Sequence, residues 1–164
     1  MKLYNTLLGV ILVIFLFNFG ILFYANNFCN CKIIHNFCVR HEIFGVQYSH
    51  IYFYIFLGLF FPSYFWTFQI LGLLWELFEI YLDHNNAFAI KYFHGCLSKK
   101  PSTIKNQSIL NYKVYRNNTK YLNPIDKLFN IKNSKIHFWH GSIAEVIANI
   151  FGFYIGTLLN KFII

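Results

Sequence analysis

The feature that most limits the possible folds of this chain is the length of its segments without charged side chains. No charged residue occurs from position 3 to position 30, and between positions 43 and 82 only Glu76 and Glu79 are charged. A helix that crosses the hydrocarbon core of a bilayer needs about 20 predominantly apolar residues. Only 12% of all residues are charged, about half the usual fraction of ~25% in soluble domains. The sequence therefore predicts an integral membrane protein and argues against a soluble globule or a disordered chain.

Four segments meet this requirement, so the predicted fold is an all-α membrane protein with four transmembrane helices in a single membrane domain. Pro62 divides the second apolar stretch into two spans, because proline ends a helix at or before the preceding residue. The first span has an alternative as a signal peptide, but its apolar part exceeds the usual ~7–15 residues and no clear cleavage site follows. The predicted spans are residues 3–25, 43–61, 63–82 and 138–159, with a long basic aqueous loop at 83–137.

The basic residues predict the orientation of these spans. Ten of the 14 Lys and Arg residues lie in the 83–137 loop, and Lys32 and Arg40 lie in the first loop. With four spans these two loops share one side of the membrane, and cytoplasmic loops carry an excess of basic residues. The long loop is therefore predicted to be cytoplasmic, at a host membrane if the source is viral. Sequons at Asn106 and Asn117 would be glycosylated only in the opposite orientation.

The basic loop has two interpretations. It is either a charge cluster that stops transfer across the membrane, or a segment attracted to anionic lipid at about 1 kcal/mol per nearby basic residue. It contains no recognisable nucleic-acid module, so nucleic acid is not an expected partner. The expected partners are the lipid bilayer and a phospholipid headgroup, and the sequence identifies no protein partner.

Three of the four cysteines lie in the first loop, where zinc is one possible ligand. Cys29, Cys31 and Cys38 accompany His35 and His41, but the C-x-C spacing is closer than the usual C-x(2–4)-C of zinc sites. Reduced thiols near a membrane surface are the favoured interpretation. Two further interpretations are a disulfide, which would require the opposite orientation, and palmitoylation of a thiol.

Ionisable residues inside predicted spans identify a candidate functional site, because such groups are costly in a bilayer. Glu76 and Glu79 are three residues apart and share a helix face, which Asp83 continues one turn later. At ~1.5 Å per residue, the side chains of four residues fall at a similar depth near the basic loops, namely Glu76, Glu79, Glu145 and His50. They predict a polar pocket that opens to the leaflet on the side of these loops.

The last span carries a second polar stripe. Glu145, Asn149, Gly152 and Gly156 recur at i, i+4, i+7 and i+11, so they lie on one face of a helix. Glycine lets two backbones approach closely in a membrane, and this face is therefore predicted to pack against another helix. The second span has a comparable side, formed by His50, Tyr54 and Gly58.

These residue types indicate a particular chemistry. Three neighbouring carboxylates repel each other, so at least one is protonated or a cation binds. Carboxylates with a histidine and an amide suit a divalent cation such as Mg²⁺, Mn²⁺ or Ca²⁺. Such a cation would hold a phosphate headgroup while a carboxylate takes a proton from an attacking hydroxyl. The candidate catalytic residues are Glu76, Glu79, Glu145 and His50, the three carboxylates being the possible metal ligands, and the candidate ligand-binding residues are Asn149, His140 and Asp83.

The same residues also fit roles without catalysis. In a non-catalytic scaffold or assembly protein, the carboxylates would pair with His50, Asn149 or His140 and fix the register of the helices. A proton or ion path could use the same groups. Whether the chain is an enzyme is left open by the residues alone.

Two motifs resemble known families. The segment from Glu145 to Gly156 reads Glu-Val-Ile-Ala-Asn-Ile-Phe-Gly-Phe-Tyr-Ile-Gly, which resembles the acid-x3-Asn-x2-Gly-x3-Gly signature of VanZ-like membrane proteins. Positions 75–79 read Trp-Glu-Leu-Phe-Glu, similar to the Trp-Glu-Leu-x-Glu segment of base-exchange phosphatidylserine synthases. The first resemblance implies a small protein of a few spans. The second implies headgroup exchange on a phospholipid.

Overall fold

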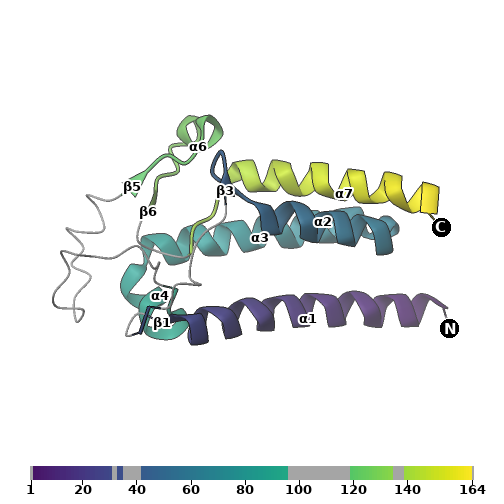
Figure 1. Ribbon diagram of the computed structural model, residues 1–164, viewed down its shortest axis with the longest axis horizontal. Coiled ribbons are helices and arrows are strands. Elements are labelled where there is room, and N and C mark those ends of the chain that lie inside the picture. Colours follow the sequence, from purple (N-terminus) through teal and green to yellow (C-terminus); the bar gives the residue numbers. More distant parts are fainter. Residues whose placement is uncertain (1, 31–32, 35–41, 96–118, 135–138, 164) are drawn as a thin grey trace.

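The computed structural model describes residues 2–30, 33–34, 42–95, 119–134 and 139–163. The longer helices lie side by side, and the short strands gather at one end of them, which we call the loop end (Figure 1). The N- and C-terminal ends both lie at the opposite end. The helices are α1 (Lys2–Phe28), α2 (Tyr48–Phe60), the 3-10 turn η1 (Pro62–Tyr64), α3 (Phe65–His84), α4 (Asn86–Phe93), α6 (Pro124–Leu128) and α7 (Ile143–Ile163).

Three short antiparallel strand pairs accompany these helices. In the β3–β4 hairpin, Phe44 and Gly45 have φ angles of 51° and 74°, which is the backbone conformation of a two-residue hairpin turn. Gly45 also lies against Leu122, where an added Cβ would be 2.6 Å from the Leu122 Cβ. A side chain at position 45 would therefore be excluded. The pairs are β1 (Cys29–Asn30) with β2 (Ile33–Ile34), β3 (Glu42–Ile43) with β4 (Val46–Gln47), and β5 (Thr119–Lys120) with β6 (Asn133–Ser134).

Three helical segments are long and apolar enough to cross a membrane, namely Leu8–Phe28, Pro62–His84 and Ile143–Ile163. They confirm the prediction of a helical membrane protein. The predicted span 43–61 is only partly helical, because the β3–β4 hairpin occupies its first residues and α2 has 13 residues. This length corresponds to about 20 Å, less than the hydrocarbon core of ~30 Å. The predicted 83–137 loop also differs, since it includes α4 and α6.

Helix α1 is held to the other helices near each of its ends. Towards the termini, Val10 belongs to a buried cluster with Leu57 of α2 and Phe153 of α7. Towards the loop end, Ala25 packs in a second cluster that includes Trp139. The first span is thus packed against the rest of the folded protein in two places.

Helices α2 and α7 are in close backbone contact along their length. An added Cβ at Gly156 would collide with the Ile55 carbonyl oxygen, and one at Gly152 would lie 2.8 Å from that of Ile51. Gly58 of α2 similarly lies against the Phe153 carbonyl. The predicted packing faces of the second and last spans are therefore confirmed.

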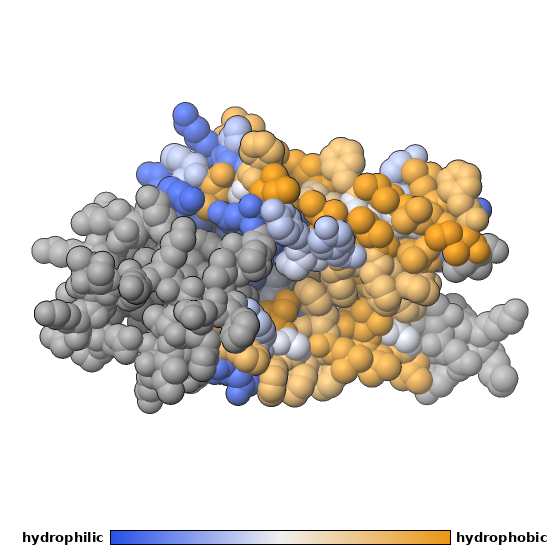
Figure 2. Space-filling view, in the orientation of Figure 1, coloured by the Kyte–Doolittle hydropathy of each residue, from blue (hydrophilic) through white to orange (hydrophobic). Residues whose placement is uncertain are grey.

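The outward surface of the helices is apolar. Figure 2 shows hydrophobic side chains covering the helices between the loop end and the termini, whereas hydrophilic residues concentrate near the loop end. Large side chains such as Phe15, Trp66 and Phe151 are 63%, 75% and 64% exposed. An exposed apolar surface of this extent would not be stable in water and fits contact with lipid.

The glycine contacts give the first prediction. We expect Gly156→Ala to lower the free energy of unfolding by about 1–3 kcal/mol, the usual cost of overpacking, because its Cβ meets backbone atoms of α2 that cannot move aside. Gly20→Ala is the matched control, since nothing lies within 4 Å of a Cβ at that position. The measurement is thermal or denaturant unfolding in detergent. Equal stability of the two variants would show that the close α2–α7 contact is not needed.

Candidate functional site

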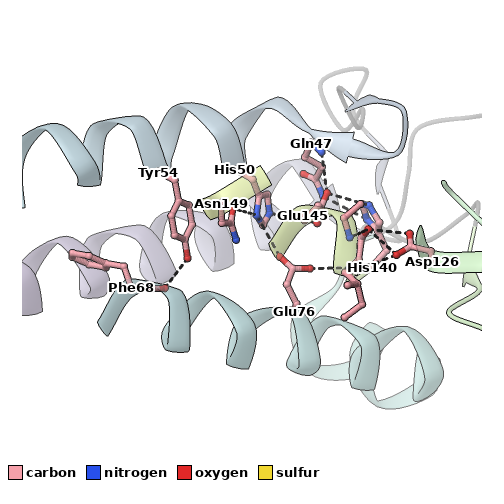
Figure 3. Close-up of polar contacts among 12 residues, drawn as sticks. Gln47, His50, Tyr54, Phe68, Glu76, Asp126, His140, Glu145 and Asn149 are labelled. Carbon is pink, nitrogen blue, oxygen red and sulfur yellow. Dashed lines mark hydrogen bonds and ion pairs between the residues drawn. The ribbon is translucent and has the colours of Figure 1, made fainter. Parts of the chain in front are cut away.

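The candidate site lies where α2, α3 and α7 meet near the loop end. His50 comes from the first turn of α2, Glu76 and Glu79 come from α3, and Glu145 comes from the first turn of α7. All four side chains are at most 8% exposed. The polar residues of three separate helices therefore form one buried group, as Figure 3 shows for His50, Glu76 and Glu145.

His50 connects the two acidic helices. Its Nδ1 lies 3.3 Å from Glu76 Oε1 and 3.3 Å from Asn149 Oδ1. Its Nε2 lies 3.7 Å from Glu145 Oε2. An imidazole between two carboxylates can carry a proton between them or share a cation with them.

In two of the carboxylates, one oxygen accepts a hydrogen bond from a backbone N–H group. The Ser142 N–H donates to Glu76 Oε2 at 2.9 Å, and the Gln47 N–H donates to Glu145 Oε1 at 2.9 Å. The residue before Ser142 is Gly141, where an added Cβ would collide with the Glu76 carbonyl oxygen. Each carboxylate is thus fixed on one side, and its other oxygen is directed towards His50.

His140 lies beside this group, and Asp83 continues the acidic face of α3. His140 Nε2 is 3.8 Å from Glu145 Oε1, and His140 Nδ1 is 3.5 Å from Gln47 Nε2. Asp83 is fully buried one turn beyond Glu79 on α3. The structure therefore brings His140 to Glu145 and places Asp83 on the predicted helix face.

The four central residues match the dimensions of a cation site. One ligand atom from each of His50, Glu76, Glu79 and Glu145 lies within 4.8 Å of all the others. Ligands bound to one ion at about 2.3–2.6 Å can be at most about 5 Å apart. Three carboxylates and one imidazole form a donor set suited to Mn²⁺, Mg²⁺ or Ca²⁺. The residues present therefore fit the predicted divalent cation.

Two cavities adjoin this group. One has a volume of about 250 Å³ and is bounded mainly by apolar side chains of α1, α2 and α3, with His50, Glu76 and Asn149 among its lining residues. The second, of about 440 Å³, includes Gln47, His50 and Glu79 in its lining. His50 therefore borders both cavities.

Sequence reasoning missed a second polar cluster that positions the start of α7. Asp126 accepts hydrogen bonds from the Ser142 hydroxyl at 2.9 Å and from the Ile143 N–H at 3.1 Å. Asn123 caps α6 by accepting the Asp126 N–H at 2.8 Å, and Pro124 follows it in the first turn. The Asn-Pro-x-Asp pattern is a recognisable helix start and could have indicated this element.

The other missed contributors had no such signal. The N–H groups of Gln47 and Ser142 act through the backbone, which any residue but proline provides. The sequence placed Tyr54 on the same side of the second span as His50 but did not indicate its partner: its hydroxyl donates to the Phe68 carbonyl oxygen at 2.9 Å, and its side chain lines the apolar cavity. Only the packing of α2 on α3 reveals these contacts.

Cys29 differs from the favoured interpretation of the cysteines. It is disulfide-bonded and fully buried at the end of α1, so the expectation of a reduced thiol is wrong at this position. The backbone of Gly95, beside α4, donates to the Cys29 carbonyl oxygen at 3.0 Å. The other residues of the first-loop zinc hypothesis, Cys31, His35, Cys38 and His41, lie outside the described residues.

Compared with known proteins, the chain matches no family model, no curated protein and no solved structure. The site is consequently interpreted from its own geometry.

The Asp126 cluster gives the second prediction. Asp126→Ala leaves the Ser142 hydroxyl and the Ile143 N–H without their acceptor, which costs about 1–3 kcal/mol when such groups are buried. We expect a loss of that size in the free energy of unfolding measured in detergent. Asp126→Asn keeps nearly the same shape, so its stability shows how much of the effect depends on the charge of the carboxylate.

The stability contribution of Asp126 also depends on pH. Burial raises the pKa of the Asp126 carboxyl above its usual range, and hydrogen bonds from Ser142, Ile143 and Asn123 act against this rise. The folded protein thus binds this proton more tightly than the unfolded chain, so the contribution decreases as pH rises through the raised pKa. As pH rises through this raised pKa, the free energy of unfolding of wild type should fall relative to that of Asp126→Asn. A difference that is constant across mildly acidic pH would contradict this.

Proposed function

We propose that this membrane protein binds or modifies a phospholipid or similar amphiphile, with a divalent cation held by Glu76, Glu79, Glu145 and His50. The observation that carries the proposal is the group of four ligand atoms within 4.8 Å of one another, next to a largely apolar cavity. The proposal also places the chain among VanZ-like proteins, on the motif between Glu145 and Gly156.

The charge of the group supports the cation. Ionised carboxylates buried together are unfavourable unless they are protonated, paired or coordinated to a metal. His50 supplies at most one positive charge for three carboxylates. A divalent cation would neutralise the remainder and would attract an anionic headgroup to the same place. When bound, such an ion acts as a Lewis acid towards a phosphoryl or carbonyl oxygen.

The protein's own residues then have separate roles. Glu76 and Glu145, each fixed by a backbone N–H, would act as ligands or as the base that receives a proton from a hydroxyl. His50, between them, would carry that proton or contact the phosphate. Asn149, at 3.3 Å from His50 Nδ1, would set the orientation of the imidazole ring.

A non-catalytic scaffold is the second candidate, and a specific observation favours it. His50 contacts both Glu76 and Glu145, so one side chain connects all three helices around the site. In a scaffold these contacts would serve only to lock the helices together. Removing the charge of Glu76 should then affect stability and leave no binding function to lose.

The third prediction separates the two candidates. Purified protein is titrated with Mn²⁺ and free ion is followed by electron paramagnetic resonance, with Mg²⁺ and Ca²⁺ as competitors. We expect wild type to bind Mn²⁺ and Glu76→Gln to bind it at least about 10–100-fold more weakly, the range typical of altered metal environments. Glu42→Gln, in the β3–β4 hairpin, is the matched control and should bind as wild type does.

Unfolding measurements complete this test. If Glu76→Gln binds Mn²⁺ as wild type does, or if wild type binds none, the cation proposal fails. Loss of stability in Glu76→Gln with no Mn²⁺ binding by wild type would support the scaffold. Retained stability with lost binding would support the cation site.

We infer that the loop end faces an oxidising compartment. The Cys29 disulfide is the supporting observation, because disulfides persist outside reducing cytosol. The excess of basic residues predicts the reverse, but the 83–137 segment is near the ~60-residue length above which that rule weakens. A disulfide depends directly on the redox state of its compartment, whereas the excess of basic residues is a statistical bias.

Glycosylation mapping gives the fourth prediction. When the chain is translated with microsomes, Asn106 and Asn117 should be glycosylated, and endoglycosidase should reverse the shift in gel mobility. Asn106→Gln and Asn117→Gln should each remove one step of the shift. An unglycosylated protein that is nevertheless inserted in the membrane would restore the cytoplasmic orientation predicted from charge.

A further inference from the structure

The two cavities beside the site lie on either side of one aromatic contact. Phe17 of α1 and Trp75 of α3 line both cavities, and their rings meet edge to face with centroids 6.3 Å apart. We call the cavity of about 250 Å³ the tail chamber and that of about 440 Å³ the head chamber. Three of the four ligand residues line these chambers, since Glu76 lines the first, Glu79 the second and His50 both.

The tail chamber has the chemistry of a site for a hydrocarbon chain. Along α2 its lining continues from His50 through Phe53 to Leu57, a distance of roughly 10 Å at ~1.5 Å per residue. Phe68 and Leu71 of α3 line the same length. His50, Glu76 and Asn149 lie together at one part of this lining, so an occupant would have its polar group there and its apolar part towards the termini.

The tail chamber also has a route from the bilayer. Leu71 and Leu74 line it, and they are 37% and 55% exposed. Side chains that border both a cavity and the lipid-facing surface mark a lateral opening. A lipid chain could enter there from the membrane without crossing water.

The volume of the tail chamber limits the occupant to one chain. An apolar cavity of about 150 Å³ holds a benzene molecule; by proportion, a volume of about 250 Å³ holds roughly ten carbon atoms. The chamber would therefore enclose the part of one chain nearest the head, and the rest of a longer chain would extend through the lateral opening. A second acyl chain would have no place inside it. The head chamber is also bounded largely by apolar side chains, and Gln47, Ser49 and Glu79 are among its lining residues.

We propose that the site takes a single-chain anionic amphiphile, with its chain in the tail chamber and its anionic oxygens at His50 and Glu76, facing the head chamber. This assignment rests on the proposed function, because the anion is expected to meet the divalent cation held there. Carboxylate and phosphate heads share this chemistry. They differ in size, and the head chamber has room for the larger one.

The experiment uses native mass spectrometry of the full chain in detergent with Mn²⁺ present. The probes are 1-oleoyl lysophosphatidate, oleate and dioleoyl phosphatidate. Wild type should retain one lysophosphatidate or oleate molecule per chain and at least about tenfold less of the two-chain lipid. Preferential retention of dioleoyl phosphatidate would overturn the proposal.

Variants of neighbouring leucines test the position of the chain. Leu74→Trp fills the tail chamber and should weaken retention of both single-chain probes at least tenfold. Leu73→Trp makes the same change at a neighbouring residue that is not among the lining residues of either chamber, and it should bind as wild type does. Equal retention by these two variants, with equal thermal stability, would overturn the assignment of the chamber.

A glycine variant distinguishes the two head groups. Gly20 lines the head chamber and has open space around a Cβ, so Gly20→Leu reduces the chamber without a backbone clash. If the natural head is phosphate-sized, wild type retains lysophosphatidate better and Gly20→Leu removes this preference. If it is carboxylate-sized, oleate is retained better by both. An unchanged lysophosphatidate preference in Gly20→Leu would overturn placement of the head in this chamber.

The same samples separate this inference from the proposed cation site. Mn²⁺ binding without retention of any single-chain probe overturns the chamber assignment and leaves the cation site supported. If wild type retains a single-chain probe, Leu74→Trp abolishes this retention and wild type binds no Mn²⁺, the chamber assignment is supported and the cation site is overturned.

Discussion

The close contact between the backbones of α2 and α7 is the constraint on which the rest of this structure depends. Gly152 and Gly156 allow α7 to lie directly on the carbonyl oxygens of α2. This approach brings His50 of α2 to Glu145 and Asn149 of α7. Larger residues at the glycine positions would separate the helices by more than a hydrogen bond can span. The same packing thus stabilises the fold and assembles the polar group.

Much of this arrangement could be predicted from the sequence, because a bilayer imposes simple rules. Uncharged stretches revealed the long helices, and the helical spacing of Glu145, Asn149 and Gly152 revealed which face of α7 is buried. The features that the sequence did not predict are contacts between residues far apart in the chain. The partner of a buried side chain on another helix depends on packing, so the spacing could not pair His50 with Glu76. The short length of α2 was also missed. The Phe44-Gly45 turn excludes a helix at this point, so α2 begins only at Tyr48.

The loop end is more ordered around the site than a predicted aqueous loop would be. Asp126 is separated from Glu145 by 19 positions, yet its carboxylate holds the first turn of the helix that carries Glu145. Ser142 belongs to both clusters, because its hydroxyl donates to Asp126 and its N–H donates to Glu76. One residue therefore links the aqueous segment to the buried carboxylates. An extramembrane change at α6 would be transmitted to the site through a short, defined set of hydrogen bonds.

Helix α1 forms one wall of both chambers and is held by buried contacts near its two ends, at Val10 and Ala25. Its apolar span, Leu8–Phe28, has 21 residues and a length of about 32 Å, so it exceeds the hydrocarbon core in bilayers thinner than the average of ~30 Å. A helix that is too long for its bilayer tilts, and the degree of tilt depends on membrane thickness. The width of the space beside the carboxylates would then vary with the thickness of the surrounding bilayer. The same chain would bind its ligand differently in membranes of different composition.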